Sequence, residues 1–129
     1  MSCNLNDSFK GFIQDNDEKS EIIVKLADSY LAGNFDMARD YFTPDGKHFF
    51  NNLEFDVDGI IDGYNSHSLI FKDIKHNDRE VYTATFTDGT VETFHDFDWS
   101  ATSILTGKEY SYPCHCRWVW VKDKIASTT

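Results

Sequence analysis

A histidine within an aromatic and β-branched stretch is the side chain of this sequence best suited to chemistry. His95 lies in a segment from Val91 to Ile104 that alternates in the manner of a β-strand. The residues that alternation places on the same face as His95 are Thr93, Phe97, Trp99 and Ala101. This face has the larger apolar content, so we expect it to point inward, where partial desolvation lowers the pKa of an imidazole and keeps it neutral. Such a histidine can accept a proton from a bound substrate, or it can be a core residue hydrogen-bonded to a tyrosine or carboxylate.

The following strand supplies aromatic and sulfur-containing side chains to the same interior. Alternation between Tyr110 and Val121 groups five residues on one face: Tyr112, Cys114, Cys116, Trp118 and Trp120. Two tyrosines from predicted helices, Tyr30 and Tyr64, can direct their phenols into this space or simply pack at its rim. The candidate site therefore has His95 as the catalytic base, with ligand-binding residues Tyr30, Tyr64, Phe97, Trp99, Cys116 and Trp118.

Two aspartates beside the histidine form a second candidate pair. Asp96 and Asp98 share the opposite strand face from His95, where they are expected to be solvated charges. A one-residue bulge would turn both inward, and two neighbouring carboxylates could then act as an acid and base pair. The interpretation of the whole site therefore depends on the register of this strand.

Metal and cofactor sites find no support in the spacing of the ligand-type residues. Cys114-His115-Cys116 contains zinc-preferred ligands, but neighbouring strand residues point to opposite faces and no second cysteine pair completes a tetrahedron. Asp56-Val57-Asp58-Gly59 is similar to a calcium loop with its glycine two places early, and it fits a helix cap better. With no glycine-rich phosphate loop or metalloprotease pair in the sequence, we expect neither a metal nor a cofactor.

Hydrophobic periodicity indicates helices in the first half of the chain and long strands in the second. Apolar residues recur every three or four positions from Glu21 to Leu31, with Ser20 as the predicted N-cap. The other predicted elements are a short helix at 36–41, a turn at 43–46, a short strand at 48–50, a helix from Asp56 to about Phe71, and strands at 80–87, 91–104 and 110–121. The last three strands should form an antiparallel meander.

Composition places the chain among single globular domains. Its 129 residues are 40% hydrophobic and 16% aromatic, so we expect one domain spanning 1–129, with 1–17 as a polar lead-in. Twelve basic against 22 acidic residues give a net charge of −10, which disfavours nucleic acid and anionic membranes as partners. The three cysteines, an odd count, suggest free thiols, and no secretory signal or apolar run of the ~20 residues that span a bilayer is present. We therefore expect a soluble, cytoplasmic protein.

The order of these elements resembles the nuclear transport factor 2-like superfamily, in particular its SnoaL-like branch related to polyketide cyclases and ketosteroid isomerases. The resemblance rests on Tyr30-Leu31-Ala32-Gly33-Asn34-Phe35-Asp36, Tyr41-Phe42-Thr43-Pro44-Asp45-Gly46, Gly59-Ile60-Ile61-Asp62-Gly63-Tyr64 and Lys122-Asp123-Lys124-Ile125. It implies an α+β fold, a cone-shaped α+β barrel in which a curved antiparallel sheet wraps around three N-terminal helices. It also implies a hydrophobic pocket on the concave face, and often a homodimer through the convex face.

Two functions follow from the resemblance. The first is a cofactor-free pocket protein that binds a small apolar organic molecule and catalyses a proton-transfer step such as isomerisation, cyclisation or dehydration. The second is a non-catalytic module that uses the fold to dimerise and associate with a protein partner. The sequence does not reproduce the catalytic residues of ketosteroid isomerases, which favours the second, whereas the inward aromatic residues around His95 favour the first. A homodimer would pair convex faces bearing Arg117, Val119 and Val121.

Overall fold

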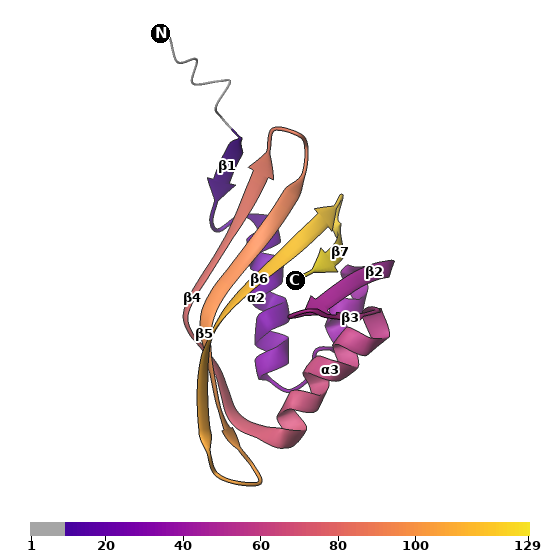
Figure 1. The fold of residues 1–129 in the computed structure, drawn as a ribbon. Helices are drawn as coiled ribbons and strands as arrows, with labels where there is room; N and C mark the ends of the chain where they lie inside the picture. Colours follow the sequence, from indigo (N-terminus) through magenta and orange to yellow (C-terminus); the bar gives the residue numbers. More distant parts are fainter. Residues whose placement is uncertain (1–9) are drawn as a thin grey trace.

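The computed structural model describes residues 10–129 and consists of one curved sheet with helices against it (Figure 1). Cys3 and Phe9 lie outside the described residues. The elements, in chain order, are β1 (Gly11–Gln14), α2 (Glu18–Leu31), the 3-10 helix η1 (Asp36–Asp40), β2 (Phe42–Phe50), β3 (Leu53–Phe55), α3 (Val57–Ile70), β4 (Phe71–Phe86), β5 (Val91–Ser103), β6 (Glu109–Val121) and β7 (Lys124–Thr128). The seven strands lie in the order β1-β4-β5-β6-β7-β2-β3.

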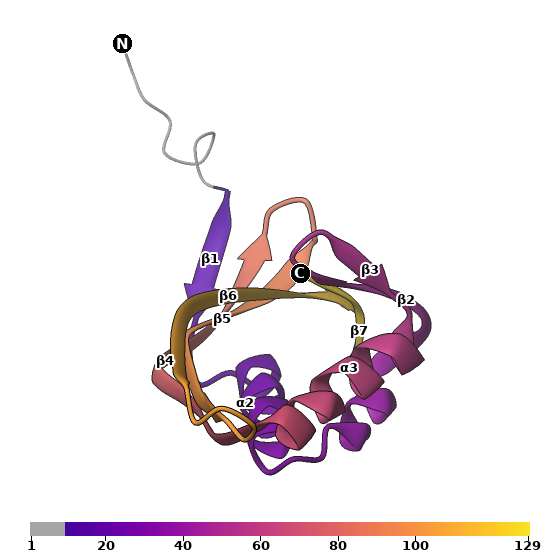
Figure 2. The same ribbon diagram turned by 60° about the horizontal axis from the view of Figure 1, so that its bottom comes forward.

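The sheet curls around α2 and α3, which lie on its concave side (Figure 2). This is the predicted cone-like α+β arrangement, with two differences. The described chain has two α-helices and one 3-10 helix instead of three N-terminal helices, and α3 follows the β2–β3 hairpin. The sheet is also not wholly antiparallel, because β2 pairs with β7 in parallel. No helix among the described residues is long and apolar enough to cross a bilayer.

Two bulges bend β4, which is the longest strand. The β4–β5 register shifts between Lys72 and Lys75 and again between Asn77 and Glu80, with one extra residue in β4 each time. Asp73 and Asp78 have φ angles of 54° and 53°, the left-handed conformation that aspartate tolerates better than most residues. Because bulges increase strand bending and twist, these two aspartates explain much of the curvature that forms the concave face.

The two α-helices begin at aspartates that cap their first turns. The Asp17 carboxylate accepts hydrogen bonds from the backbone N–H and the hydroxyl of Ser20, so Asp17 caps α2 and the prediction of Ser20 as N-cap was wrong. Asp56 accepts from the Gly59 N–H at 2.7 Å, which confirms the predicted cap of α3. A carboxylate also favours this position because it complements the positive end of the helix dipole.

The core lies where the amphipathic faces of α2 and α3 meet the sheet. Ile23 and Leu26 from α2, Ile61 from α3 and Ile125 from β7 are at most 1% exposed. Around them pack Trp118 and Trp120 of β6, at 7% and 5% exposure. The three- and four-residue spacing in α2 was thus a valid guide to its buried side.

Several segments differ from the sequence predictions. β3 and residues 71–79 of β4 were not predicted as strands. The lead-in contains β1, which pairs with the end of β4, and the predicted short helix is a 3-10 helix. The predicted turn at 43–46 lies inside β2 instead, where the register with β7 shifts between Phe42 and Lys47, so the turn-forming residues produce a bulge. Lys122, with a φ of 56°, helps form a tight turn into β7, a strand that the prediction missed.

Candidate functional site

A cavity of about 770 Å³ opens on the concave side of the sheet, bounded by residues of α2, α3 and strands β2 and β4–β6. Its walls are mainly aromatic rings, together with Ala27, Cys114 and Cys116. Among residues 10–129, those that line the cavity include no Asp, Glu, Lys or Arg, although 26% of the chain is charged. A second hollow of about 450 Å³ beside the start of α2 differs, because charged residues of both signs line it.

The seven residues proposed from the sequence as the catalytic base and the ligand-binding residues all line this cavity. They are His95, Tyr30, Tyr64, Phe97, Trp99, Cys116 and Trp118. The reason is the β5–β6 ladder, which runs without a register shift from Val91 opposite Trp120 to Thr102 opposite Glu109. An unbroken ladder preserves alternation, so the inward faces of both strands stay inward along their whole length.

His95 is almost entirely enclosed, at 1% exposure. Its ring lies 4.3 Å from the Phe97 ring and 5.3 Å from the His76 ring, measured between centroids. Burial, with smaller contributions from His76 and Arg79, lowers the pKa of His95 to about 3. The imidazole is therefore neutral at physiological pH, and its Nε2 has no hydrogen-bond partner within residues 10–129.

His76 is a cavity residue that the sequence interpretation missed. It comes from β4 and pairs with Trp99, while Val81 of the same strand pairs with His95. His76 and Val81 are an odd number of residues apart, so strict alternation would place them on opposite faces. The bulge between Asn77 and Glu80 resets the alternation and turns both inward. Burial lowers the pKa of His76 to about 4, so this imidazole is also neutral.

A short chain of hydrogen bonds connects three elements across the cavity wall. The indole Nε1 of Trp99, on β5, donates to the Tyr30 hydroxyl of α2 at 3.0 Å. The same hydroxyl is hydrogen-bonded to Nδ1 of His67, on α3, at 2.7 Å. Burial raises the pKa of Tyr30 to about 12 and lowers the pKa of His67, so both groups are neutral at pH 7. His67 was also missed, although it follows Tyr64 by three residues on the inward side of α3.

Three further ionisable cavity groups are uncharged as well. Burial raises the pKa of the Cys116 thiol to about 12 and raises that of Cys114, so neither is a ready thiolate nucleophile. The Tyr64 phenol also has a pKa above its usual value, mainly because it is buried. No group of three or more metal-ligand side chains occurs anywhere in the described range 10–129.

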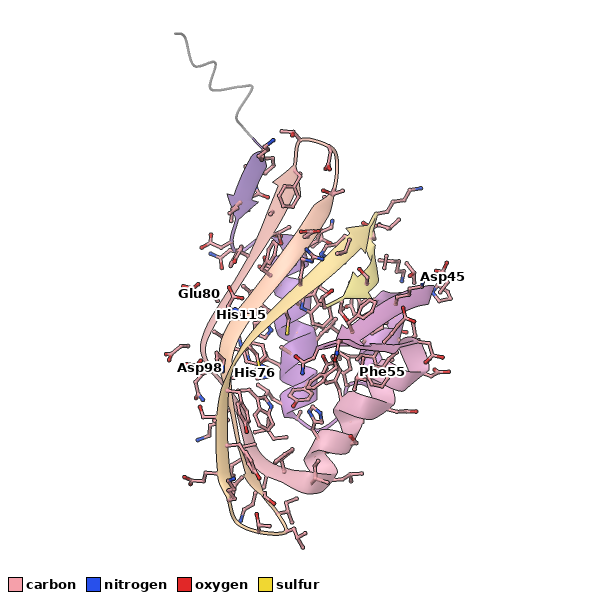
Figure 3. The ribbon with its side chains drawn as sticks, in the orientation of Figure 1. Asp45, Phe55, His76, Glu80, Asp98 and His115 are labelled. Atoms are coloured by element: carbon pink, nitrogen blue, oxygen red, sulfur yellow. The ribbon has the colours of Figure 1, made fainter. Side chains whose placement is uncertain are left out.

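Asp96 and Asp98 lie on the convex side of β5, away from the cavity. Figure 3 shows Asp98 pointing outward from the sheet, whereas His76 lies toward the helices. Asp96 is hydrogen-bonded to Nδ1 of His115 at 3.0 Å and accepts from the Tyr82 hydroxyl at 3.2 Å. The bulges occur in β4 and not in β5, so nothing turns the two aspartates inward.

Comparison with known proteins supports the fold and not a particular activity. No protein family profile and no curated protein match the sequence. A crystal structure described as a "putative polyketide cyclase" from Pseudomonas putida KT2440 superposes with a TM-score of 0.70 and 15% identity, covering 85% of this chain and 87% of that chain. The chain therefore has the fold of that protein, which agrees with the resemblance to SnoaL-like proteins. At this identity the likeness concerns the fold alone.

Proposed function

We propose that this protein is a SnoaL-like pocket protein that binds a small, uncharged and largely apolar organic molecule in the cavity of about 770 Å³. The observation that carries the proposal is the absence of Asp, Glu, Lys and Arg side chains from the wall within the described part of the chain. The His, Tyr and Cys side chains with shifted pKa values there are neutral at pH 7.

Desolvation explains why such a cavity selects neutral ligands. A charged ligand loses its hydration on entering and finds no opposite charge on the wall to replace it. A neutral ring system gains instead from burial against Phe97, Trp99 and Tyr64. The net charge of −10 resides on other surfaces and does not enter the binding step directly.

Proton-transfer chemistry is the catalytic extension of this proposal, and the description of the structural neighbour as a cyclase is consistent with it. His95 would take a proton from the bound molecule. With a pKa of about 3, His95 is a weak base, so the transfer requires a ligand whose proton is unusually acidic. Isomerisation, cyclisation or dehydration of an activated carbonyl compound would satisfy this condition.

A pair of dyes that differ in one charged group tests the binding proposal. N-phenyl-1-naphthylamine is neutral, and 1-anilinonaphthalene-8-sulfonate has the same ring system with a sulfonate. Both fluoresce more strongly in apolar surroundings, so titration gives a Kd for each. We expect the neutral dye to bind at least about tenfold more tightly, because the sulfonate has no cation to pair with. Equal affinities, or no binding of either dye, would contradict the proposal.

Two substitutions on one strand locate the binding site. Cys116→Trp fills the cavity from β6, while Val119→Trp adds the same bulk to the convex face of that strand. We expect the first to weaken binding of the neutral dye by at least about tenfold and the second to leave it unchanged. Cys116→Phe provides a smaller block should the tryptophan variant fail to fold. Equal losses in the Cys116 and Val119 variants would place the dye elsewhere.

We also propose a homodimer through the convex face. Val121 is 56% exposed, and the stacked rings of Tyr82 and Phe94 are only partly buried on the same side of the sheet. Pairing two such faces would bury apolar surface that a monomer leaves in water. Light scattering at micromolar concentration should give twice the mass of 14.9 kDa, and a monomer mass would overturn this proposal.

A further inference from the structure

The indole of Trp99 determines the direction of the hydrogen bonds that connect Trp99, Tyr30 and His67. An indole N–H can only donate, so the Tyr30 oxygen accepts from Trp99 at 3.0 Å. Tyr30 is 8% exposed, and its hydroxyl has one other hydrogen-bond partner among the described residues, Nδ1 of His67 at 2.7 Å. If His67 donated this bond, the buried Tyr30 hydrogen would be left without an acceptor within residues 10–129, which costs free energy.

The Tyr30 hydroxyl therefore donates to His67, and this assigns the tautomer of the imidazole. A neutral imidazole has one N–H, so acceptance at Nδ1 places the proton on Nε2. No described side chain or backbone group accepts a hydrogen bond from Nε2 of His67. This nitrogen is nevertheless not fully buried. It is therefore reachable from the cavity that His67 lines.

Surrounding rings fix the orientation of the His67 side chain. Tyr30, Tyr64 and Phe71 pack edge-on against it, with interplanar angles between 83° and 89°. Phe50 and Trp99 complete the enclosure at 76° and 70°. A ring packed in this way loses little rotational freedom when a ligand binds, so its one free N–H is pre-organised.

We infer that the His67 Nε2–H is a fixed hydrogen-bond donor to a carbonyl or other acceptor oxygen of the bound molecule. This inference rests on the proposed binding function and names the ligand class: a neutral ring compound that carries an acceptor oxygen. A neutral imidazole can donate this bond without adding charge to the cavity. Trp99 and Tyr30 are positioning residues, because they act on the ligand through His67.

Two isosteric ligands test the inference. 2-Acetylnaphthalene has a carbonyl oxygen where 2-isopropenylnaphthalene has a methylene group, and displacement of N-phenyl-1-naphthylamine gives a Kd for each. In the wild-type protein we expect the ratio of ketone to alkene affinity to exceed that in His67→Phe by about three- to tenfold, which is what one hydrogen bond is worth. His67→Gln, which retains an N–H near the Nε2 position, should recover part of the ratio.

A matched variant distinguishes the N–H of His67 from the hydroxyl of Tyr64, which lies on the same helix. Tyr64→Phe removes a phenol that also lines the cavity, so both Kd values can change, but the ratio of ketone to alkene affinity should stay above that of His67→Phe. Loss of the preference in Tyr64→Phe but not in His67→Phe would overturn the assignment. If ketone and alkene bind with the same ratio in wild-type and His67→Phe, the inference fails while the pocket stands. If neither compound nor the dye binds, the proposed function itself fails.

Nitrogen NMR of the imidazole provides a measurement that needs no ligand. Long-range proton–nitrogen correlations distinguish the two neutral tautomers, and we expect His67 to be in the Nε2–H form. Tyr30→Phe removes the donor that fixes this form, so the variant should show a mixture. A predominant Nδ1–H form in the wild-type protein would contradict the inferred direction of the chain.

Discussion

Two chains of hydrogen bonds in this protein start in the same way and end differently. At one end of the sheet, the Trp120 indole donates to Thr93, and contacts of 2.9 Å continue through Thr83 to Ser20. Ser20 donates to the Asp17 carboxylate at 2.6 Å. At the other end, Trp99 donates to Tyr30 and Tyr30 to His67. We call these the closed chain and the open chain.

The difference between the two chains separates a structural role from a binding role. In the closed chain every hydroxyl passes its hydrogen to the next oxygen and a carboxylate accepts the last one, so no donor remains. Burial by itself raises the pKa of Asp17, but its hydrogen bonds, those from Ser20 foremost, outweigh this effect and the pKa lies below its usual value. The open chain ends in an N–H that faces a cavity. A buried hydrogen-bond network that ends in a donor without an acceptor can bind a ligand there. A network in which every donor has an acceptor contributes to stability instead.

The largest difference between the chains should appear when each tryptophan is removed. Trp120 is 5% exposed and lies in the core, so Trp120→Ala should lower the free energy of unfolding by about 3–5 kcal/mol. Trp99 borders an existing cavity, and Trp99→Ala should cost only about 1–3 kcal/mol. Urea unfolding measures both. A larger loss in Trp99→Ala would show that the cavity end is the more tightly packed region.

Acid should destabilise the protein through buried imidazoles that neither chain contains. Burial lowers the pKa of His48 to about 4 and that of His95 to about 3, from about 6.5 in the unfolded chain. Below pH 6.5 the unfolded state therefore binds more protons than the folded state. The free energy of unfolding is highest above that pH and decreases as the pH falls toward 4. Each histidine contributes a slope of about 1.4 kcal/mol per pH unit. Urea unfolding at pH 7, 6 and 5 should show this loss, and His48→Gln should reduce the slope by one histidine's share.

Interrupting each chain at its middle hydroxyl should have a smaller effect. Thr83→Val leaves the Thr93 hydrogen without its acceptor in a site that is 3% exposed, and we expect a loss of about 1–3 kcal/mol. Tyr30→Phe interrupts the open chain at the border of a cavity, where the packing is less tight, and should cost about 0.5–1.5 kcal/mol. Thermal unfolding of the two variants compares them, and equal losses would remove the distinction between the chains.

The sequence predicted the inward faces of β5 and β6 because their ladder has no bulge. His95, Trp99 and Trp118 could be assigned to the cavity from alternation alone. The periodicity of α2 and an aspartate cap of α3, at Asp56 or Asp58, were also predicted, since both depend on local chemistry. What could be predicted was therefore whatever depends on residues near one another in the chain.

The features that escaped prediction depend on partners distant in the sequence. His76 was missed because the predicted strand began at residue 80, after it. The alternation of β4 is also reset by left-handed conformations at Asp73 and Asp78, which no pattern of residue types identifies. β1 and β7 are too short to be recognised until the strands that pair with them are known. The role of His67 depends on Tyr30 and Trp99, 37 and 32 positions away, and only the three-residue spacing from Tyr64 gave a local signal.

The smallest effect should come from the two aspartates that belong to neither chain. Asp96 bonds to the exposed side chain of His115, and Asp98 points outward, so both carboxylates lie on the face opposite the cavity. Because an exposed contact of this kind contributes little, Asp96→Asn and Asp98→Asn should each change the free energy of unfolding by less than about 1 kcal/mol. The Kd of N-phenyl-1-naphthylamine should change by less than about twofold, since no charge in the cavity wall is altered. A tenfold change in either variant would mean that β5 presents its other face to the ligand, and Asp96 and Asp98 would then replace His95 and His67 as the groups that act on it.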